Sequence, residues 1–373
     1  MVHRRHVEAR LEDGGALGRW AASNALDWRE RMWNGAVHAF EEDASHGPGF
    51  TLVVQAEALY AFARLAATAP DGSSPMIAVA KAASALTGRF LSPDGAPGFV
   101  SGVDANDRVL DATRGLDGHA VALKALAAAI AAGVVAARPA AEVTVDFLDD
   151  ELATGSEGYR ETAASALPRR QASHMRLLEA TLALHAATGA PAHLARAHRL
   201  FDLFRFRFGA HEAVGLVETF DRDWAPLGAG RSAPLSTAHA ARWISLLGAY
   251  ERASGVPTQG HARRLYEALG RCVGPDGLLA ETEGGPAAPR RARTQALGIA
   301  ALRVARDVWG VDASPAADAL EAALLARFVD PPGGARWREE DGVAAHVDAS
   351  TLGAFVDACA PLAAIPLAVA RAA

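Results

Sequence analysis

The chain has 373 residues, of which 50% are hydrophobic and 21% charged, so it can bury a large core. Its 37 basic and 43 acidic residues give a formal net charge of −6, and the absence of any basic run argues against a nucleic-acid partner. Cys272 and Cys359 are the only cysteines. A disulfide framework is therefore not expected, and a reducing cytoplasm fits this composition.

The N-terminal stretch MVHRRHVEARLEDGG has no apolar segment of the kind that a secretory signal needs. The longest apolar run, residues 125–137, is rich in alanine and too short to span a bilayer. We therefore expect a cytoplasmic protein without a membrane partner.

Apolar residues recur at helical spacing along the whole chain, and Gly/Pro breaks separate the helical segments. Each helix pair is joined by such a break, and a glycine-rich hairpin then leads to the next pair. The hairpins are expected at 92–111, 211–224, 274–285 and 330–342, with the irregular segment 151–168 as a flap in place of one more. The predicted helices are 17–43, 51–67, 76–91, 115–135, 138–150, 173–187, 192–208, 236–253, 258–272, 293–308, 314–328 and 349–370.

Alternate helices differ in character. Helices 115–135 and 293–308 are apolar nearly all round, whereas 192–208 and 258–272 each carry a face of arginine and glutamate. Helices that are apolar all round belong inside a fold and amphipathic helices outside it. The sequence therefore predicts an all-α (α/α)6 barrel, two concentric rings of six helices, formed by a single domain over residues 1–373. All hairpins would lie at one end, where we expect the ligand site.

The stretch 169–247 carries the densest set of candidate site residues. His239 and Trp243 lie four residues apart and so share one face of a helix, which places a titratable ring beside an aromatic surface. No zinc motif, phosphate-binding glycine loop or Gly-x-Ser-x-Gly elbow is present. The sequence thus favours neither a metal site nor a nucleotide site, and nothing supports a Ser/His/Asp hydrolase.

Several segments resemble the N-acylglucosamine 2-epimerase family, which includes mannose isomerases, sulfoquinovose isomerases and cellobiose 2-epimerases. The more specific ones are residues 174–180 (HMRLLEA) and 218–227 (ETFDRDWAPL). Weaker matches, in the expected order, are residues 54–60, residues 117–120, His239 with Trp243, and residues 348–352. The family's fold is the (α/α)6 barrel, in agreement with the helix count.

The resemblance implies proton transfer next to the carbonyl of a sugar, without metal or cofactor. Such chemistry needs a general base, a general acid and groups that stabilise an enediolate, and histidine suits both proton roles. Family members supply two histidines on opposite sides of the sugar, a third nearby, an arginine and orienting glutamates.

The chain keeps one of these histidines as His239 and departs from the family pattern elsewhere. The departures are Arg242 and Gln295 in place of glutamates, Arg176 in place of a histidine, Glu57 in place of an arginine, and Gly353-Ala354 in place of a Tyr-His pair. Because Glu57 and Arg242 exchange the expected charges, we hypothesise that a charge pair is swapped between them.

From the residues and the resemblance we predict a catalytic set and a substrate-binding set. The catalytic set is His239, Arg176 and Arg242; the substrate-binding set is Glu57, His119, His174, Glu218, Trp224, Trp243 and His346. Alternatives stay open for these residues. His119 and His174 could only brace helix ends, Trp224 could fasten its hairpin instead of stacking on a sugar, and Arg176 could form an ion pair with Glu57 or Glu179.

The favoured interpretation is a carbohydrate isomerase or 2-epimerase acting on a mono- or disaccharide, with or without an anionic substituent. The alternatives are a sugar-binding or regulatory protein on the same fold that has lost its proton carriers, or a different reaction at the same site. The expected partner is a small-molecule sugar, with no nucleic acid and no membrane, and the interpretation allows for a homodimer.

Overall fold

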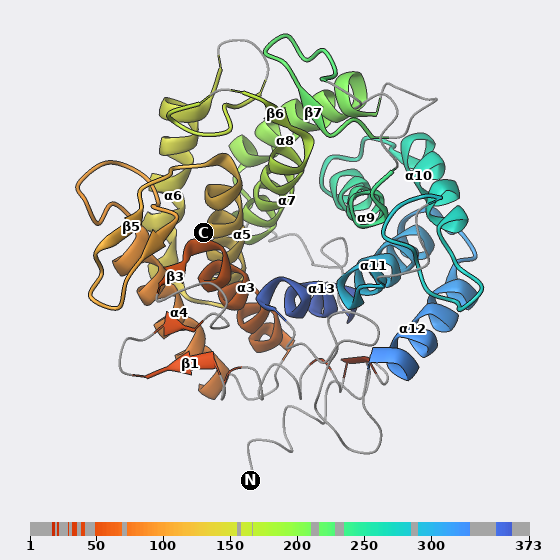
Figure 1. The fold of residues 1–373 in the computed structure, drawn as a ribbon, viewed down its shortest axis with the longest axis horizontal. Helices are drawn as coiled ribbons and strands as arrows, with labels where there is room; N and C mark the ends of the chain where they lie inside the picture. Colours follow the sequence, from red (N-terminus) through yellow and green to blue (C-terminus); the bar gives the residue numbers. More distant parts are fainter. Residues whose placement is uncertain are drawn as a thin grey trace.

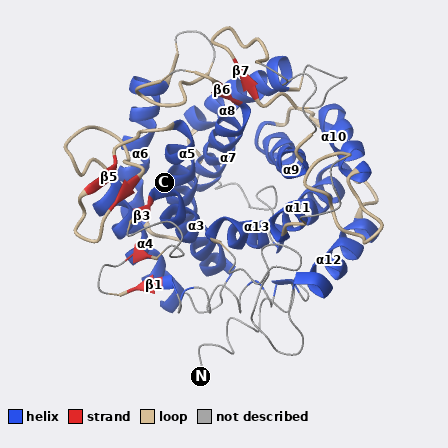
Figure 2. Ribbon diagram, viewed as in Figure 1, coloured by secondary structure: helices blue, strands red, loops and turns tan. Residues whose placement is uncertain are grey.

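The architecture is a closed ring of helices in two layers (Figure 1). The computed structural model describes residues 17–18, 21, 29, 32–35, 39–41, 49–68, 73–154, 158–165, 167–209, 216–227, 235–284, 290–328 and 348–359. Eleven helices lie in this part of the chain, and its strands form only small sheets of two or three short strands in the connections (Figure 2).

Six helices form the inner layer. They are α3 (Leu52–Thr68), α5 (Leu116–Ala131), α7 (Gln171–Thr188), α9 (Thr237–Ser254), α11 (Ala292–Trp309) and α13 (Ala349–Cys359). Each packs on the next, and α13 packs back on α3, so the ring closes. Two helices three places apart, such as α3 and α9, therefore lie opposite one another.

The outer layer covers the inner helices one by one. It consists of α4 (Ser73–Phe90), α6 (Arg138–Phe147), α8 (Pro191–Leu203), α10 (Gln259–Arg271) and α12 (Ser314–Phe328). These helices pack on α3, α5, α7, α9 and α11 respectively. Three short turns, η3 (Val135–Ala137), η4 (Leu148–Leu152) and η5 (Phe204–Phe208), flank them.

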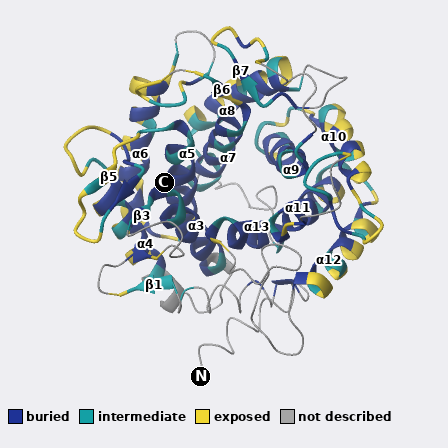
Figure 3. Ribbon diagram, in the orientation of Figure 1, coloured by how far each residue is buried: buried dark blue, intermediate teal, exposed yellow. Residues whose placement is uncertain are grey.

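The predicted alternation of inner and outer helices is confirmed. Every residue of α5 from His119 to Ile130 is buried, as expected of a helix surrounded by others. The outer helices α10 and α12 instead bury one side and expose the other (Figure 3). The (α/α)6 barrel is therefore the fold, and we keep a single domain over residues 1–373 as our interpretation.

One predicted helix is wrong in part. The expectation of a helix over 17–43 fails near its end, because β1 (Trp33–Asn34) pairs antiparallel with β2 (Ala39–Phe40). Leu17 and Ala21, near its start, are buried, and the Leu17 amide lies 3.2 Å from Glu321 of α12. The last predicted helix begins as expected, although residues 360–370 lie outside the described part.

Short strands join neighbouring connections at the end of the ring where the inner helices begin. β3 (Phe50–Thr51) pairs with β4 (Gly102–Val103), which pairs with β5 (Val109–Asp111), and β6 (Arg169–Arg170) pairs with β7 (Thr219–Phe220). Within segment 151–168, the described residues form bridges from Ala153 to Tyr159 and from Thr162 to Gly115, as residues of other connections do. We call this end, which carries the predicted site, the hairpin end.

None of the described helices combines the length with the apolar character needed to cross a bilayer.

Candidate functional site

Four inner helices carry the same bracing device at their fourth residue. In α3 and α11 this residue is Gln55 or Gln295, and in α5 and α7 it is His119 or His174. Each side chain accepts a hydrogen bond from a backbone amide of the preceding connection. The donors and their distances are Phe40 N at 2.8 Å, Phe99 N at 2.9 Å, Tyr159 N at 3.1 Å and Leu279 N at 2.7 Å. The device fastens each connection to the helix that follows it.

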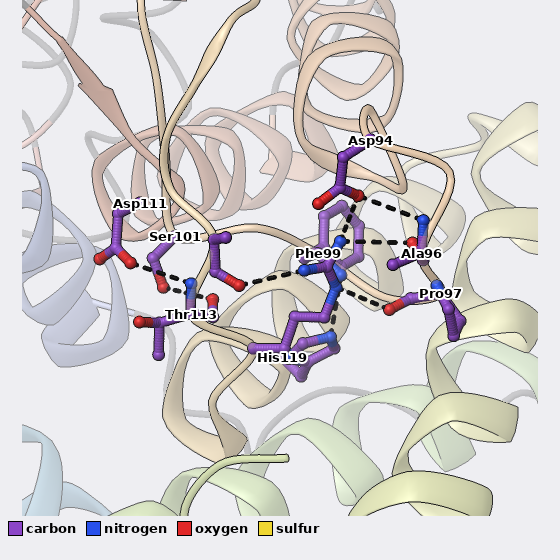
Figure 4. Close-up of polar contacts among 10 residues, drawn as sticks. Asp94, Ala96, Pro97, Phe99, Ser101, Asp111, Thr113 and His119 are labelled. Atoms are coloured by element: carbon purple, nitrogen blue, oxygen red, sulfur yellow. Dashed lines mark hydrogen bonds and ion pairs between the residues drawn. The ribbon is translucent and has the colours of Figure 1, made fainter. Parts of the chain in front are cut away.

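Both ring nitrogens of the two histidines are occupied by backbone groups. Figure 4 shows the contact between His119 and Phe99. The Nε2 atoms of His119 and His174 accept the amide hydrogen bonds, so Nδ1 carries the proton and donates it to the carbonyl four residues earlier, at 2.7 and 2.8 Å. Their exposed fractions are 0% and 1%, and this burial lowers the pKa of each ring to about 4. The geometry favours the bracing alternative over contact with a sugar.

We expect His119→Gln to leave stability nearly unchanged, because Gln55 and Gln295 make the same contact elsewhere in the ring. His119→Ala should lower the free energy of unfolding by about 1–3 kcal/mol, since it leaves the Phe99 amide buried without a partner. Urea unfolding of both variants checks this. Equal losses in the two variants would contradict a role based on this hydrogen bond.

The two buried histidines also predict a pH dependence of stability. Their folded-state pKa of about 4 lies below the ordinary value of 6.5, so the unfolded chain binds more protons between these pH values. Their contribution is complete above pH 6.5 and is lost as pH falls towards 4. We expect the melting temperature to fall across this window, and His119→Gln with His174→Gln to flatten the fall. An unchanged slope in the double variant would contradict this account.

A second device repeats in three connections and uses a glutamate. The carbonyls of Glu161, Glu218 and Glu281 each accept the first amide of an inner helix, at 2.8, 3.0 and 3.0 Å. Their carboxylates then contact the third residue of the following inner helix, in each case at 2.7 Å. The contacts are Glu161 to Ser173, Glu218 to His239 and Glu281 to Thr294. The sequence signal is a Glu-Thr pair at 161–162, 218–219 and 281–282.

The helix α9 departs from this repeat at two adjacent positions. Its third residue is His239 where α7 and α11 have hydroxyl side chains, and its fourth is Ala240 where the neighbours have a brace. His239 and Glu218 are 30% and 31% exposed, so solvent reaches both side chains. The Glu218 carboxylate accepts from Nδ1–H, which leaves the lone pair on Nε2, and Nε2 contacts no partner in the described residues. An oriented, accessible imidazole of this kind can act as a general base.

Two predicted arginines lie on the inner helices but differ in accessibility. Arg176 of α7 pairs with Asp117 of α5 at 2.8 Å, and its side chain is 22% exposed. Its partner is thus neither of the two carboxylates considered from the sequence. Arg242 of α9 pairs with Glu179 at 2.5 Å, and both side chains are less than a tenth exposed. Arg242 follows His239 by three residues and so lies below it on the same helix face.

A layer of charged and polar side chains lies beneath the hairpin end. Its members from α3, α5, α7 and α13 are all the ninth residue of their helix, about 12 Å along the axis. Lys124 contacts Glu179 at 3.0 Å and Asp357 at 3.8 Å, and its ammonium group lies 3.6 Å from the centre of the Tyr60 ring. Tyr60 donates a hydrogen bond to Asp357. Arg242, which lies nearer the hairpin end, donates a hydrogen bond to Glu179 in the layer.

This charged layer holds its ionised groups by mutual attraction. Burial raises the pKa of Glu179, but the charges of Arg242 and Lys124 outweigh it and bring the pKa to about 2. Burial likewise lowers the pKa of Arg242, and Glu179 followed by Glu57 raises it above its ordinary value. The layer therefore forms a floor below His239 in which Glu179 and Arg242 are both ionised.

We hypothesised from the sequence that Glu57 and Arg242 form a charge pair. In the structure the two residues interact only at long range. Both are the sixth residue of opposite inner helices, and Glu57 contributes to the raised pKa of Arg242. The direct partner of Arg242 is nevertheless Glu179. Glu57 is 4% exposed and forms no ion pair with the described residues. A β-carbon at Gly353 would lie 3.3 Å from the Glu57 carboxylate, so Glu57 lies close to this glycine.

Both predicted tryptophans are buried in packed aromatic clusters. Trp224 adopts φ 64°, is 6% exposed and lies edge-on to His174 with ring centroids 5.1 Å apart. It fastens its connection to the barrel. Trp243 is 0% exposed and packs on Phe204 at 4.3 Å, so it faces the outer layer and not the site. Neither ring is accessible for stacking on a sugar in this conformation. His346 lies outside the described residues.

One arginine at the hairpin end, Arg293, was not among the site residues predicted from the sequence. Arg293 is the second residue of α11, and it makes no ion pair or hydrogen bond with the described residues. Burial, followed by the nearby charge of Arg242, lowers its pKa. The only sequence signal was its place next to Thr294 and Gln295, which belong to the repeated devices.

No group of three or more histidine, cysteine, aspartate or glutamate side chains in the described ranges could hold a metal ion.

The sequence match decides the family. The model of the N-acylglucosamine 2-epimerase (GlcNAc 2-epimerase) family matches residues 35–280, which is most of the chain and includes the Glu218–His239 pair. The chain belongs to the N-acylglucosamine 2-epimerase family. No curated protein matches it in sequence.

Solved structures agree with this family on the fold. Cellobiose 2-epimerase from Spirochaeta thermophila DSM 6192 aligns with a TM-score of 0.77 at 20% identity, over 93% of this chain and 97% of its own. A D-mannose isomerase aligns with a TM-score of 0.78 at 19% identity, over 95% and 96% of the two chains. The GH76 α-mannanase BT2949 of Bacteroides thetaiotaomicron also aligns, with a TM-score of 0.69 at 12% identity, over 93% and 96%. Since a glycoside hydrolase shares it, the barrel by itself does not identify the chemistry of this epimerase-family member.

Proposed function

We propose that the protein is a carbohydrate isomerase or 2-epimerase that moves a proton next to the carbonyl of a mono- or disaccharide. The observation that carries this proposal is the Glu218–His239 pair, an accessible imidazole whose proton position is fixed by a carboxylate. Membership of a sugar epimerase and isomerase family supports the same class of reaction.

In the proposed reaction the Nε2 atom of His239 takes the proton from C2 of the open-chain sugar. The electron pair of the broken C–H bond forms the C1–C2 double bond of an enediolate, and the negative charge moves to the former carbonyl oxygen. Glu218 stabilises the imidazolium that results. Return of the proton to C1, with transfer of the O2 proton to O1, gives the ketose. The epimer forms if the enediolate first turns its other face to His239, so that the proton returns to the opposite face of C2 and O1 regains the carbonyl.

Arginine would stabilise the enediolate. Arg176 suits this role because it is partly exposed and stands on a neighbouring inner helix, α7. Arg242 is buried under His239, and we assign it to holding Glu179 and the floor of the site in place. Glu57 and His346 remain proposed substrate contacts, and the cytoplasmic location and the homodimer remain predictions.

One observation favours the alternative of a sugar-binding protein without turnover. The pair Gly353-Ala354 offers no titratable side chain where the resemblance implies Tyr-His, and Ala354 is 1% exposed. The test is incubation with aldoses, ketoses and N-acetylhexosamines, followed by chromatographic separation of the products and by thermal unfolding with each sugar. A new isomer or epimer supports the enzyme. Sugar-dependent stabilisation without any new sugar would contradict it and support the binding protein.

A further inference from the structure

Arg293, which was not among the residues predicted from the sequence, differs from its neighbours because it forms no ion pair with the residues that the structure describes. Arg293 stands in the first turn of α11, next to α9 in the inner ring and at the same end as His239. Its Nε atom is shielded from solvent and has no hydrogen-bond partner in the described part of the chain. Arg176 and Arg242, by contrast, each pair with a carboxylate at 2.8 Å or less.

The surroundings of Arg293 make this arrangement costly in the absence of a ligand. Its strongest charged neighbour is another cation, Arg242, and Arg176 adds a weaker repulsion. Glu57 and Asp348 oppose these charges at a distance, but neither forms an ion pair with Arg293. A guanidinium group that is partly removed from water and has no partner loses solvation that a bound oxyanion would replace. Arginine binds such groups through two parallel N–H donors.

We propose that Arg293 binds an oxyanion substituent of the sugar, so that the substrate is an anionic sugar carrying a phosphate, sulfonate or carboxylate group. This inference rests on the proposed function only in taking the ligand to be a sugar. Arg293 sets specificity here: it holds the end of the substrate remote from the proton transfer, while His239 and Glu218 act at C2.

Glu57 is one of two carboxylates that would oppose an anion at Arg293. It forms no ion pair with Arg293, so its charge would act on a bound anion at a distance. An anion at Arg293 would be attracted by Arg293, Arg242 and Arg176 together, with Glu57 and Asp348 as the opposing charges. Removing the charge of Glu57 should therefore strengthen the binding of anionic sugars relative to that of neutral sugars.

The test is a binding comparison of matched sugars by isothermal titration calorimetry. The pairs are glucose with glucose 6-phosphate, mannose with mannose 6-phosphate, and glucose with its 6-sulfonate and with glucuronate. At least one anionic member should bind at least tenfold more tightly than its neutral counterpart, and the tightest one identifies the substituent. Equal affinity within every pair would overturn the proposal, as would binding of none of these sugars.

Variants assign the effect to this residue. Arg293→Gln should weaken binding of the anionic sugar by about 10- to 100-fold, the range of a hydrogen bond to a charged group, and leave the neutral sugar unchanged. Arg293→Lys should keep part of the affinity, and Glu57→Gln should increase it. The matched control is Arg263→Gln on the outer helix α10, which removes an exposed arginine paired with Glu267. An equal loss in the control would reveal a general charge effect and overturn the assignment to Arg293.

Inorganic phosphate and sulfate provide a second readout, because neither requires turnover. Each should raise the melting temperature of the wild-type protein, and Arg293→Gln should abolish the rise; stabilisation that persists in this variant would contradict the proposal. The outcome is independent of catalysis. Selective anion binding without turnover would support the subsite and contradict the proposed function. Turnover with no preference for the anionic member of any pair, in the wild type and in Arg293→Gln alike, would support the proposed function and contradict the subsite.

Discussion

Replacement of His239 by alanine is expected to reduce sugar interconversion by at least about 10²- to 10⁴-fold, the usual contribution of a general base. The expectation follows from geometry: Glu218 fixes Nδ1–H of His239 and leaves Nε2 as the proton acceptor. Initial rates at saturating sugar measure the effect. A rate within threefold of the wild type would show that His239 takes no proton.

Glu218 should act through His239, and its replacement should show a different signature. Glu218→Gln is expected to lower kcat more than it changes KM and to shift the pH–rate profile, because the carboxylate stabilises the imidazolium. The structure provides a matched control in Glu281→Gln, which removes the equivalent carboxylate from Thr294 in the next repeat. If both variants lower kcat equally, the effect of Glu218 is structural.

The largest effect on stability is expected from Glu179→Gln. Glu179 receives both Arg242 and Lys124 in a buried layer, so its neutralisation leaves two cations without their main partner. Breaking a buried ion pair from one side typically costs about 3–5 kcal/mol. The free energy of unfolding from urea titration checks this. The control is Glu267→Gln on α10, whose exposed pair with Arg263 should contribute less than about 1 kcal/mol.

A double variant tests whether the cost of Glu179→Gln arises from the arginine that it leaves without a partner. Replacing Glu179 by glutamine together with Arg242 by methionine removes one stranded cation, so the double variant should be more stable than Glu179→Gln alone. Strictly additive losses would contradict the coupling of these residues through the charged layer.

The helices were predictable from sequence because their pattern depends on local spacing. The uninterrupted apolar run of α5 and the one-sided pattern of α10 each follow from which layer the helix occupies. The start of the chain was harder, since a helical pattern over 17–43 also contains Trp33 and Phe40, which instead lie side by side on paired strands. Pairing between such short strands leaves no periodic signal.

Roles of individual side chains were predictable only in part. The position of His239 on an inner helix follows from spacing, but spacing does not show which side chains meet a neighbouring backbone. His119 and His174 therefore looked like site residues, although each binds an amide one residue after a glycine with positive φ, Gly98 or Gly158. That glycine, followed by an aromatic residue, was the available signal.

Charge contacts between helices depend on ring order, which the sequence alone does not reveal. Asp117 and Arg176 meet because α5 and α7 are neighbours, and Arg242 reaches Glu179 because α9 follows α7. For the same reason Arg293 could not be recognised as unpaired before its neighbours were known.

The most direct test of the central claim, that the Glu218–His239 pair moves a proton at C2, is proton NMR of sugars incubated with the protein in D2O. The panel comprises aldoses, ketoses, N-acetylhexosamines and their 6-phosphates. The account predicts loss of a C2–H signal for at least one of them with the wild-type protein, and retention of that signal with His239→Ala. Retention of every C2–H signal by the wild type, or equal loss in His239→Ala, would contradict it.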